Sequence, residues 1–375
     1  MFKKTLLAAT VAALLPTLAQ AEISIEPIHY VPDPWKTVPE LDWDVNTTYA
    51  NSISKVHQEG FKNEATVDQT AETGLNAGQA MSVIVQDGRM NQANVTEDAT
   101  SVRSSVLQEG RKNVANIDLG GSVYGPTSSF VEQYGRQHDT TVVSRGSLNW
   151  IGSFQYDHGQ KAAIDVWGNG NEVRSAQEGD SNSTTIGIDG SLNKAFNDQG
   201  GEWNASTTTV AGNFNTTATN QWGYENTAII DVTGSKNLVR AFQDSEYSTS
   251  DVTIDHGDLN RVLTYQDSEG SLIDIDINGD LNRVTASQEA SVGDRILVNL
   301  AGGSDRNRIQ AFQGDLHGSK NGLIDVELTG SDYNFVASAQ NGQGHESYVT
   351  ISHGDLNVVK VDQYGDRNVS TNTID

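Results

Sequence analysis

The chain has 375 residues, no cysteine, 36 glycines and a formal net charge of −25. Such acidity argues against binding to nucleic-acid phosphates, which needs a basic surface, and the absence of cysteine excludes a disulfide framework. Only 36% of the residues are hydrophobic, but glycine and asparagine recur at regular intervals, which indicates a repeat architecture rather than disorder.

Residues 1–21 have the layout of a secretory signal peptide. Lys3 and Lys4 form the basic start, a short apolar run follows, and an Ala-Gln-Ala cleavage motif ends at Ala21. The apolar run is too short to cross a bilayer, and no later segment is long enough. The sequence therefore predicts an exported chain without a membrane span.

Residues 22–49 differ in composition from the remainder of the chain. Four prolines between Pro27 and Pro39 stand among acidic and aromatic residues such as Trp35 and Trp43. Prolines at this density exclude a helix or a central strand. Two interpretations stay open for this extended leader: a disordered tether or a recognition tag.

Residues 50–375 form a repeat domain in which glutamines recur, most often every 22 residues. The glutamines are Gln58, Gln86, Gln108, Gln133, Gln155, Gln177, Gln199, Gln221, Gln243, Gln266, Gln288, Gln313, Gln340 and Gln363. From residue 149 onward an asparagine lies six residues before each: Asn149, Asn171, Asn193, Asn215, Asn237, Asn260, Asn282, Asn307, Asn334 and Asn357. A fixed period of this size is typical of solenoids.

Alternate residues before each glutamine form one constant face. The set Asn149, Ile151, Ser153 and Gln155 recurs in later repeats as asparagine, β-branched residue, small residue and glutamine. A period of two indicates a strand with one enclosed face. Enclosed amides lose their hydrogen bonds to water, so we expect them to pair in ladders between stacked turns.

A second strand completes each turn. Thr184, Ile186 and Ile188 alternate before Gly190, and Gly-x-x-Asn corners such as Gly223–Asn226 separate the strands. Glycine and asparagine suit corners because they tolerate positive φ. The sequence therefore predicts an all-β fold, a parallel β-solenoid of about fourteen two-stranded turns of roughly 22 residues.

The first repeat carries a known motif. Residues from Ser52 to Gln69 follow the pattern Ser-x5-Gln-x-Gly-x2-Asn-x-Ala-x3-Gln without exception. The repeat domain thus resembles the curlin-repeat family of curli fibre subunits, as an unusually long member. The resemblance implies inward-pointing polar ladders, export through a dedicated outer-membrane channel, and self-assembly into extracellular amyloid fibres of the biofilm matrix. It also implies a nucleator subunit as a partner and an export-targeting role for the leader, residues 22–49.

The later repeats depart from the family pattern. From Asn149 onward asparagine mostly replaces the leading serine, and an apolar residue such as Ile188 usually replaces the second glutamine. These departures leave open whether the chain resembles the major subunit or the nucleator.

The sequence predicts no catalytic, cofactor-binding or metal-binding residue. His256 and His353 occupy equivalent corners, and repetition at a corner favours a role in the turn. Corner aspartates could bind calcium, but the Gly-Gly-x-Gly-x-Asp pattern is missing, so solvated charge or a brake on premature stacking is the preferred interpretation. These aspartates are Asp258, Asp280, Asp355 and Asp366.

Together these observations predict a secreted, non-enzymatic structural subunit that polymerises end to end at the cell surface, after passage through the periplasm. A monomeric surface adhesin with a solenoid fold is the alternative, and a polysaccharide-acting β-helix enzyme is a distant third. Self-association is the expected partnership, and binding to nucleic acid is not expected.

Overall fold

The computed structural model describes most of the predicted repeat domain. All described residues belong to one compact unit, Asn46–Asp375. The predicted signal peptide, residues 1–21, and the leader, residues 22–49, lie outside the described residues. The described ranges are 52–70, 80–99, 101–121, 125–300 and 302–375.

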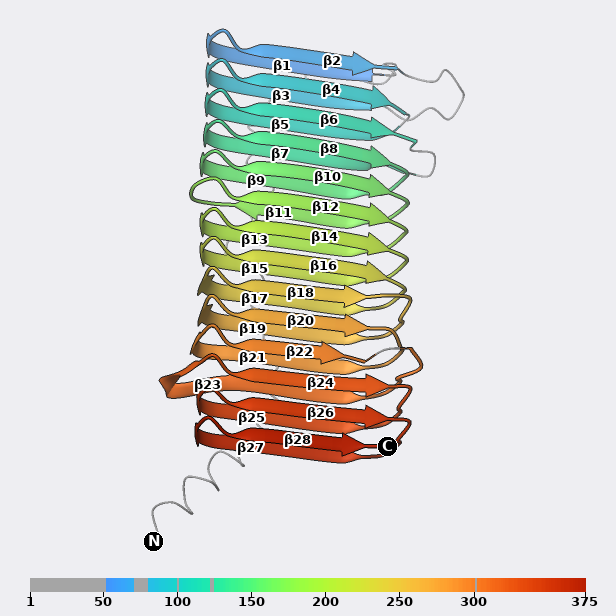
Figure 1. The fold of residues 1–375 in the computed structure, drawn as a ribbon. Coiled ribbons are helices and arrows are strands. Elements are labelled where there is room, and N and C mark those ends of the chain that lie inside the picture. The colour runs from blue at the N-terminus through green and yellow to red at the C-terminus, as the bar shows by residue number, and fades with distance from the viewer. Residues whose placement is uncertain (1–51, 71–79, 100, 122–124, 301) are drawn as a thin grey trace. The chain divides into compact units, whose positions relative to one another are not determined.

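The described part of the chain is all-β, with no helix, and forms two parallel sheets of 14 strands each. Odd-numbered strands form one sheet, here sheet A, and even-numbered strands form the other, sheet B (Figure 1). The chain changes sheet after every strand, so one strand of each sheet makes a coil. Coil 1 comprises β1 and β2, and coil 14 comprises β27 and β28. The predicted parallel β-solenoid is confirmed.

The strand bounds follow the repeat period. Sheet A contains β1 (Ser52–Phe61), β3 (Ala80–Arg89), β5 (Val102–Arg111), β7 (Thr127–Arg136), β9 (Trp150–His158), β11 (Glu172–Gln177), β13 (Lys194–Glu202), β15 (Thr216–Tyr224), β17 (Leu238–Glu246), β19 (Arg261–Glu269), β21 (Arg283–Val292), β23 (Arg308–Lys320), β25 (Phe335–Gln343) and β27 (Val358–Asp366). Sheet B contains β2 (Glu64–Gln69), β4 (Gln92–Asp98), β6 (Val114–Gly120), β8 (Asp139–Arg145), β10 (Lys161–Trp167), β12 (Ser183–Asp189), β14 (Ala205–Ala211), β16 (Thr227–Thr233), β18 (Thr249–Ile254), β20 (Leu272–Ile277), β22 (Arg295–Asn299), β24 (Leu323–Thr329), β26 (Glu346–Ser352) and β28 (Val369–Ile374).

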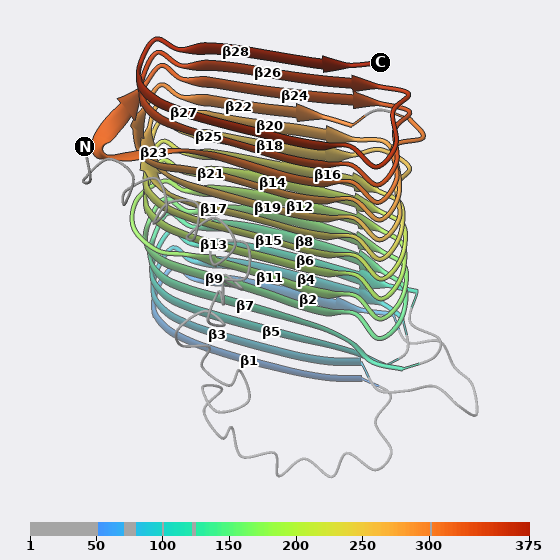
Figure 2. The same ribbon diagram turned by 90° about the horizontal axis from the view of Figure 1, so that it is seen from below.

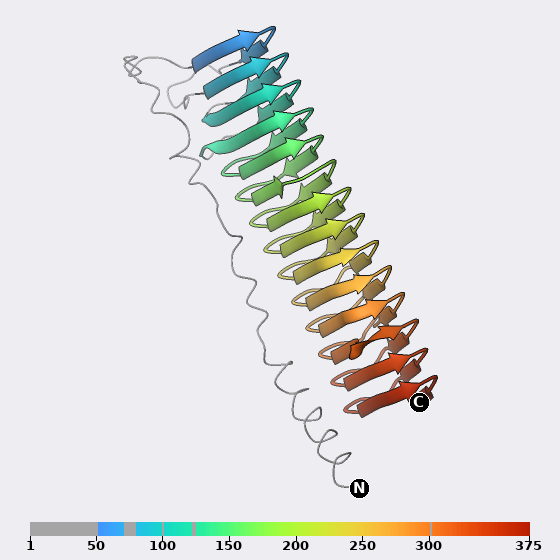
Figure 3. The ribbon, with the colours of Figure 1, turned by 90° about the vertical axis from the view of Figure 1, so that its left-hand side faces the viewer.

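Neighbouring strands pair in the same register along the stack. Gln155, Gln177 and Gln199, for example, are direct partners in β9, β11 and β13. Equivalent residues of successive coils therefore lie over one another and form rows along the stack (Figures 2 and 3). The repeat that contains residues 314–320 is longer than most others, and these residues are part of β23, where the pairing shifts register between Gln313 and Lys320.

Alternate residues of each strand point into the space between the two sheets. Sheet B contributes aliphatic side chains such as Ile186 and Ile188, which are 1% and 2% exposed. Sheet A contributes a mixed face, represented by Val173, Ser175 and Gln177 in β11, all at most 1% exposed. Full burial of an isoleucine side chain contributes roughly 1.5–3 kcal/mol. The aliphatic rows contribute hydrophobic stabilisation. The buried amides cannot, so they must be stabilised by hydrogen bonds.

The corner after β12 requires glycine. Gly190 has a φ of +145°, and a Cβ added there would lie 1.8 Å from the backbone oxygen of Gly212 in the next coil. The backbones of successive corners are thus closer than any side chain allows. Gly187, within β12, differs because a Cβ added there would meet no atom within 4 Å.

We predict opposite outcomes for alanine at these two glycines. Gly190→Ala forces an unfavourable φ and a clash with the next coil, so it should lower the free energy of unfolding by at least about 2 kcal/mol. Gly187→Ala should be neutral or stabilising by up to about 1 kcal/mol, because alanine costs less conformational entropy than glycine in a strand. Denaturant unfolding of both variants checks this, and equal effects would contradict it.

Candidate functional site

The predicted glutamines form one continuous row inside sheet A. From Gln58 to Gln340, Nε2 of each glutamine donates to Oε1 of the next, over 2.6 to 3.0 Å, and the row ends at Gln363. Gln58 is exposed, whereas the others are at most 6% exposed. The structure thus brings all the predicted glutamines together in one chain of side-chain hydrogen bonds.

Apart from Gln313, each glutamine from Gln86 to Gln363 also connects the two sheets. Nε2 of Gln177 donates to the backbone oxygen of Lys161 in β10, at 2.9 Å, and Nε2 of Gln199 donates to that of Ser183 in β12, at 3.1 Å. A neutral hydrogen bond contributes about 1 kcal/mol net, but a buried amide that loses its partner costs about 1–3 kcal/mol. The row is therefore stable only while every coil supplies an amide at this position.

The predicted asparagines form a second row, at the corner where the chain enters sheet A. Asn171 illustrates the pattern: its backbone N–H donates to Oδ1 of Asn149 at 3.0 Å, and its Nδ2 donates to the backbone oxygen of Gly190 at 2.8 Å. The same N–H to Oδ1 bond recurs from Asn149 to Asn357. Apart from the half-buried Asn357, these asparagines are at most 2% exposed.

The placement of these asparagines corrects one expectation. The alternation in the sequence predicted that asparagine and glutamine share one strand face, but Asn171 precedes β11 and lies in the corner. Its side chain bonds mainly to backbone rather than to the next amide, because the corner leaves backbone N–H and C=O groups without strand partners. The asparagine row therefore joins corners, and the glutamine row joins strands.

A third row, at the opposite corner, was missed as a set by the sequence analysis. Here the backbone N–H of each corner residue again donates to a side chain of the preceding coil. The Gly-x-x-Asn corners were visible in the sequence, but later members vary in type and hide the row. The members from coil 1 to coil 9 are Asn63, Asn91, Asn113, His138, Gln160, Asn182, Asn204, Asn226 and Ser248.

His138 takes the place of asparagine in this third row. Its Nδ1 accepts a hydrogen bond from the backbone N–H of Gln160 at 3.3 Å, and its Nε2 donates to the backbone oxygen of Tyr134 at 3.0 Å. This pair of bonds requires a neutral imidazole with the proton on Nε2. Burial lowers the pKa of His138 below its ordinary value, with a smaller opposing effect from the bond to Tyr134.

The predicted corner aspartates divide into two groups. Oδ1 of Asp258 accepts the backbone N–H of Ser235 at 2.6 Å, Oδ1 of Asp280 accepts that of Asp258 at 2.8 Å, and Asp355 accepts that of Asp332 at 2.9 Å. These three aspartates therefore act as hydrogen-bond acceptors between coils, beyond being solvated charges. Asp366 lies elsewhere, at the end of β27.

Among the described residues, the other histidines and acidic residues lie mostly on the surface. His256 forms an ion pair with the adjacent Asp255, and both side chains are exposed. Within the described ranges no group of three or more histidine or acidic residues is arranged to hold a metal ion. The described residues also include no helix with the length and apolarity needed to cross a membrane.

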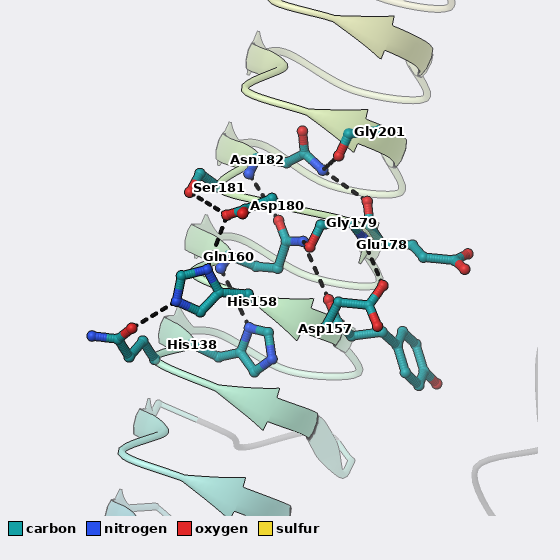
Figure 4. A network of polar contacts seen from close by, with 12 residues as sticks. His138, Asp157, His158, Gln160, Glu178, Gly179, Asp180, Ser181, Asn182 and Gly201 are labelled. Carbon is teal, nitrogen blue, oxygen red and sulfur yellow. Dashed lines mark hydrogen bonds and ion pairs between the residues drawn. The ribbon is translucent and has the colours of Figure 1, made fainter.

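A polar network crosses three coils on the outside of the third row's corner (Figure 4). His158 bonds to Oδ1 of Asp180 through Nδ1, at 3.0 Å, and to Oε1 of Gln137 through Nε2, at 2.6 Å. Ser181 Oγ also donates to Asp180, at 2.7 Å. The bonds from Ser181 and His158 lower the pKa of the Asp180 carboxyl. The sequence analysis did not detect this network, because its members differ in type from coil to coil.

Comparison of the chain with protein-family models finds no match, and comparison with curated proteins also finds none. The resemblance to curlin repeats thus remains a prediction from the sequence motif. The fold and the three rows of hydrogen-bonded side chains are the features on which a function can be built.

We predict that acid weakens the stack at His138. The folded pKa is lowered, so the unfolded chain binds a proton first, and the free energy of unfolding should fall as pH drops from about 6.5 through the folded pKa. His138→Asn restores an acceptor that does not titrate and should remove this part of the pH dependence. Denaturant unfolding of both proteins between pH 7.5 and about 4.5 checks this. Parallel curves would contradict it.

We also predict that replacing one interior glutamine with an apolar residue of similar size lowers the free energy of unfolding. Gln199→Leu removes the hydrogen bonds of Gln199 to Gln177 Nε2, to Thr184 Oγ1 and to Gln221 Oε1, although Gln177 Nε2 keeps its bond to Lys161. The free energy of unfolding should therefore drop by about 2–4 kcal/mol. Thr207→Val, on the exposed side of the same coil, should change it by less than about 0.5 kcal/mol. A loss confined to Thr207→Val would refute the importance of the row.

Proposed function

We propose that this protein is a secreted structural subunit that polymerises end to end into extracellular, curli-like amyloid fibres of a biofilm matrix. The proposal rests on the combination of in-register parallel sheets and an uninterrupted glutamine row. Parallel, in-register strands with stacked amides are the structural elements of cross-β fibres. In this chain a single molecule already contains that arrangement over 14 coils.

The observation that carries the proposal is the state of coils 1 and 14. In the strand order of each sheet, β1, β2, β27 and β28 have a hydrogen-bonded neighbour on one side only. Edge strands present backbone N–H and C=O groups that readily pair with another chain. Neither of these edges is interrupted by proline within the described residues, and both carry exposed charged side chains such as Glu64 on β2 and Lys360 on β27.

The side chains of the two end coils match. Gln58, Gly60 and Asn63 in coil 1 have the same spacing as Gln363, Gly365 and Asn368 in coil 14. If coil 1 of a second molecule follows coil 14, Gln363 Nε2 can donate to Gln58 Oε1 as interior glutamines do. The exposed Gln58 would then be buried. Addition in this order continues both sheets and the row, with the same strand direction throughout.

The direct test is assembly of the purified chain without its predicted signal peptide. Fibres that bind amyloid dyes and diffract at about 4.7–4.8 Å along their axis are expected. A chain that stays monomeric under seeded conditions would favour the alternative, a monomeric surface module. Export through an outer-membrane channel and dependence on a nucleator subunit are further proposals, and they require secretion and seeding assays.

We predict that proline at the open edge of coil 14 stops elongation without unfolding the protein. The N–H groups of Phe335 and Glu346 donate forward to the next coil, and their register partners in coil 14 are Val358 and Val369. The N–H groups of these two valines therefore point to the open edge, where proline is tolerated. Val358→Pro combined with Val369→Pro should slow fibre growth at least about tenfold.

The matched control replaces the same two valines with alanine. Both side chains are exposed, at 70% and 65%, so alanine should leave folding and growth nearly unchanged. Circular dichroism and denaturant unfolding show whether each variant is folded, and seeded growth curves give the rate. Equal growth of the folded proline and alanine variants would rule out elongation at this edge.

A further inference from the structure

One outer row of side chains on the stack carries opposite charges in its two halves. It consists of the residues at the sheet A end of the corner that leads to sheet B, and we call it the corner row. The pairing register places its members directly over one another. From coil 2 to coil 10 they are Arg89, Arg111, Arg136, His158, Asp180, Glu202, Tyr224, Glu246 and Glu269.

The basic half of the corner row has no acidic partner of its own. Arg89, Arg111 and Arg136 are exposed, and no carboxylate among the described residues lies within ion-pair distance of them. Successive members are roughly 4.8 Å apart, the spacing of paired strands, so equal charges stack on equal charges. The same holds for Glu246 and Glu269 in the acidic half. The like charges within each half repel one another. An oppositely charged row lying against either half would relieve this repulsion.

The residues that follow the corner row extend the pattern. Met90 and Lys112 accompany the basic half, and Trp203, Glu225 and Tyr247 accompany the acidic half. Trp203 is 56% exposed and Tyr247 is 52% exposed. Exposed aromatic side chains between charged groups are typical of contact surfaces rather than of solvated faces.

We propose that the corner row is a docking surface for a second copy of this chain, lying antiparallel beside the first. A twofold axis between coils 5 and 6 places coil 2 opposite coil 9, coil 3 opposite coil 8 and coil 4 opposite coil 7. The resulting contacts are Arg89 with Glu246, Lys112 with Glu225, Arg136 with Glu202, and Met90 with Tyr247. His158 and Asp180, which already attract each other within one chain, meet again across the axis.

The antiparallel arrangement gives Arg89, Arg136 and Lys112 acidic partners, while Arg111 faces Tyr224 and Glu269 faces Phe61 of coil 1. Twofold symmetry makes every contact occur twice, and it closes the assembly at two copies. Parallel copies at equal height would place arginine against arginine. Parallel copies shifted by five coils would match one basic half with one acidic half. In the other acidic half only Glu202 would then face a cation, Lys320, and Glu246 would face Asp366.

A linear polyanion is the other occupant that this row suggests. It would engage only the basic half, and the acidic half of the same row together with the net charge of −25 would repel it. A second copy uses the basic half, the acidic half and the aromatic residues together. The lateral contact is independent of the end-to-end contact proposed above, because the two involve different residues and different directions.

Small-angle X-ray scattering of the freshly purified chain at high concentration, in about 20 mM and about 500 mM salt, tests the proposal. A lateral pair doubles the cross-section where coils 1–10 of the two chains overlap and lengthens the particle by only about four coils, roughly 19 Å, because coils 11–14 of each chain extend past its partner. An end-to-end pair doubles the length and keeps the cross-section. We expect the wider particle at low salt and its loss at high salt. A cross-section that stays that of one chain at low salt would overturn the lateral pair, whether or not the chain lengthens into fibres.

Charge exchange identifies the surface. Arg136→Glu and Glu202→Arg should each weaken the lateral pair at least about tenfold, and the double exchange should restore it, since both charges of the contact are then reversed together. Lys161→Glu and Glu327→Arg are exposed control variants on sheet B with the same charge changes and should have little effect. Failure of the double exchange to restore pairing would overturn the assignment. Binding of a polyuronate to the corner row without formation of a lateral pair would also overturn the assignment.

Single cysteines report the orientation, since the chain has none of its own. Across the proposed axis, Ser181→Cys residues are about one coil apart along the stack, whereas Lys112→Cys residues are about five coils apart, roughly 24 Å. A short bismaleimide should therefore link Ser181→Cys chains and not Lys112→Cys chains. Equal linking at both positions would indicate parallel copies and contradict the proposal.

Discussion

The structure depends on one constraint: a buried amide must find its partners directly above and below itself. The glutamine row satisfies this requirement because every coil supplies the same side chain at the same register position. Each bond is worth little, and a missing partner costs more than a bond contributes. The constraint therefore acts on the whole repeat domain, since a coil that shifts by one residue would leave amides unpaired in both neighbours and move aliphatic side chains to the outside.

The parts of the fold in which the same residue types recur could be predicted from the sequence. The 22-residue spacing and the alternation before Gln155 and Gln177 predicted two stacked strands per coil and an inward glutamine. The sequence was not sufficient for the corners. A corner needs any side chain that accepts a backbone N–H, and asparagine, histidine, glutamine and serine all do so, as His138 and Ser248 illustrate. The corner positions thus keep the same hydrogen-bonding role while their residue types differ. A search for repeated residue types therefore does not detect the row.

The register that pairs the buried amides also stacks the outward side chains, and where these carry like charges they repel one another. Equivalent residues stack outside the sheets as well, so similar side chains accumulate like charge. Burial lowers the pKa of Arg283, and its neighbours Arg261 and Arg308 lower it further. In sheet B, burial and the carboxylates of Asp274, Asp276 and Asp231 raise the pKa of Asp251. The variation of outward residues along most of the stack relieves this effect. The three stacked arginines Arg89, Arg111 and Arg136 of the corner row are an exception.

The same constraint decides how such a stack can end. Stacking has no internal stopping point, because the last coil presents the groups that every earlier coil used to bind its successor. The insertion in β23 is tolerated because Gly314 and Lys320, at its two ends, still pair with β21, but it does not cap the sheets. A soluble stack would need proline, charge or a covering segment at its edges. Among the described residues, coil 14 keeps Gln363 buried and carries exposed charged side chains, Lys360 and Asp362, on β27. The proposed end-to-end contact must therefore accommodate these charges.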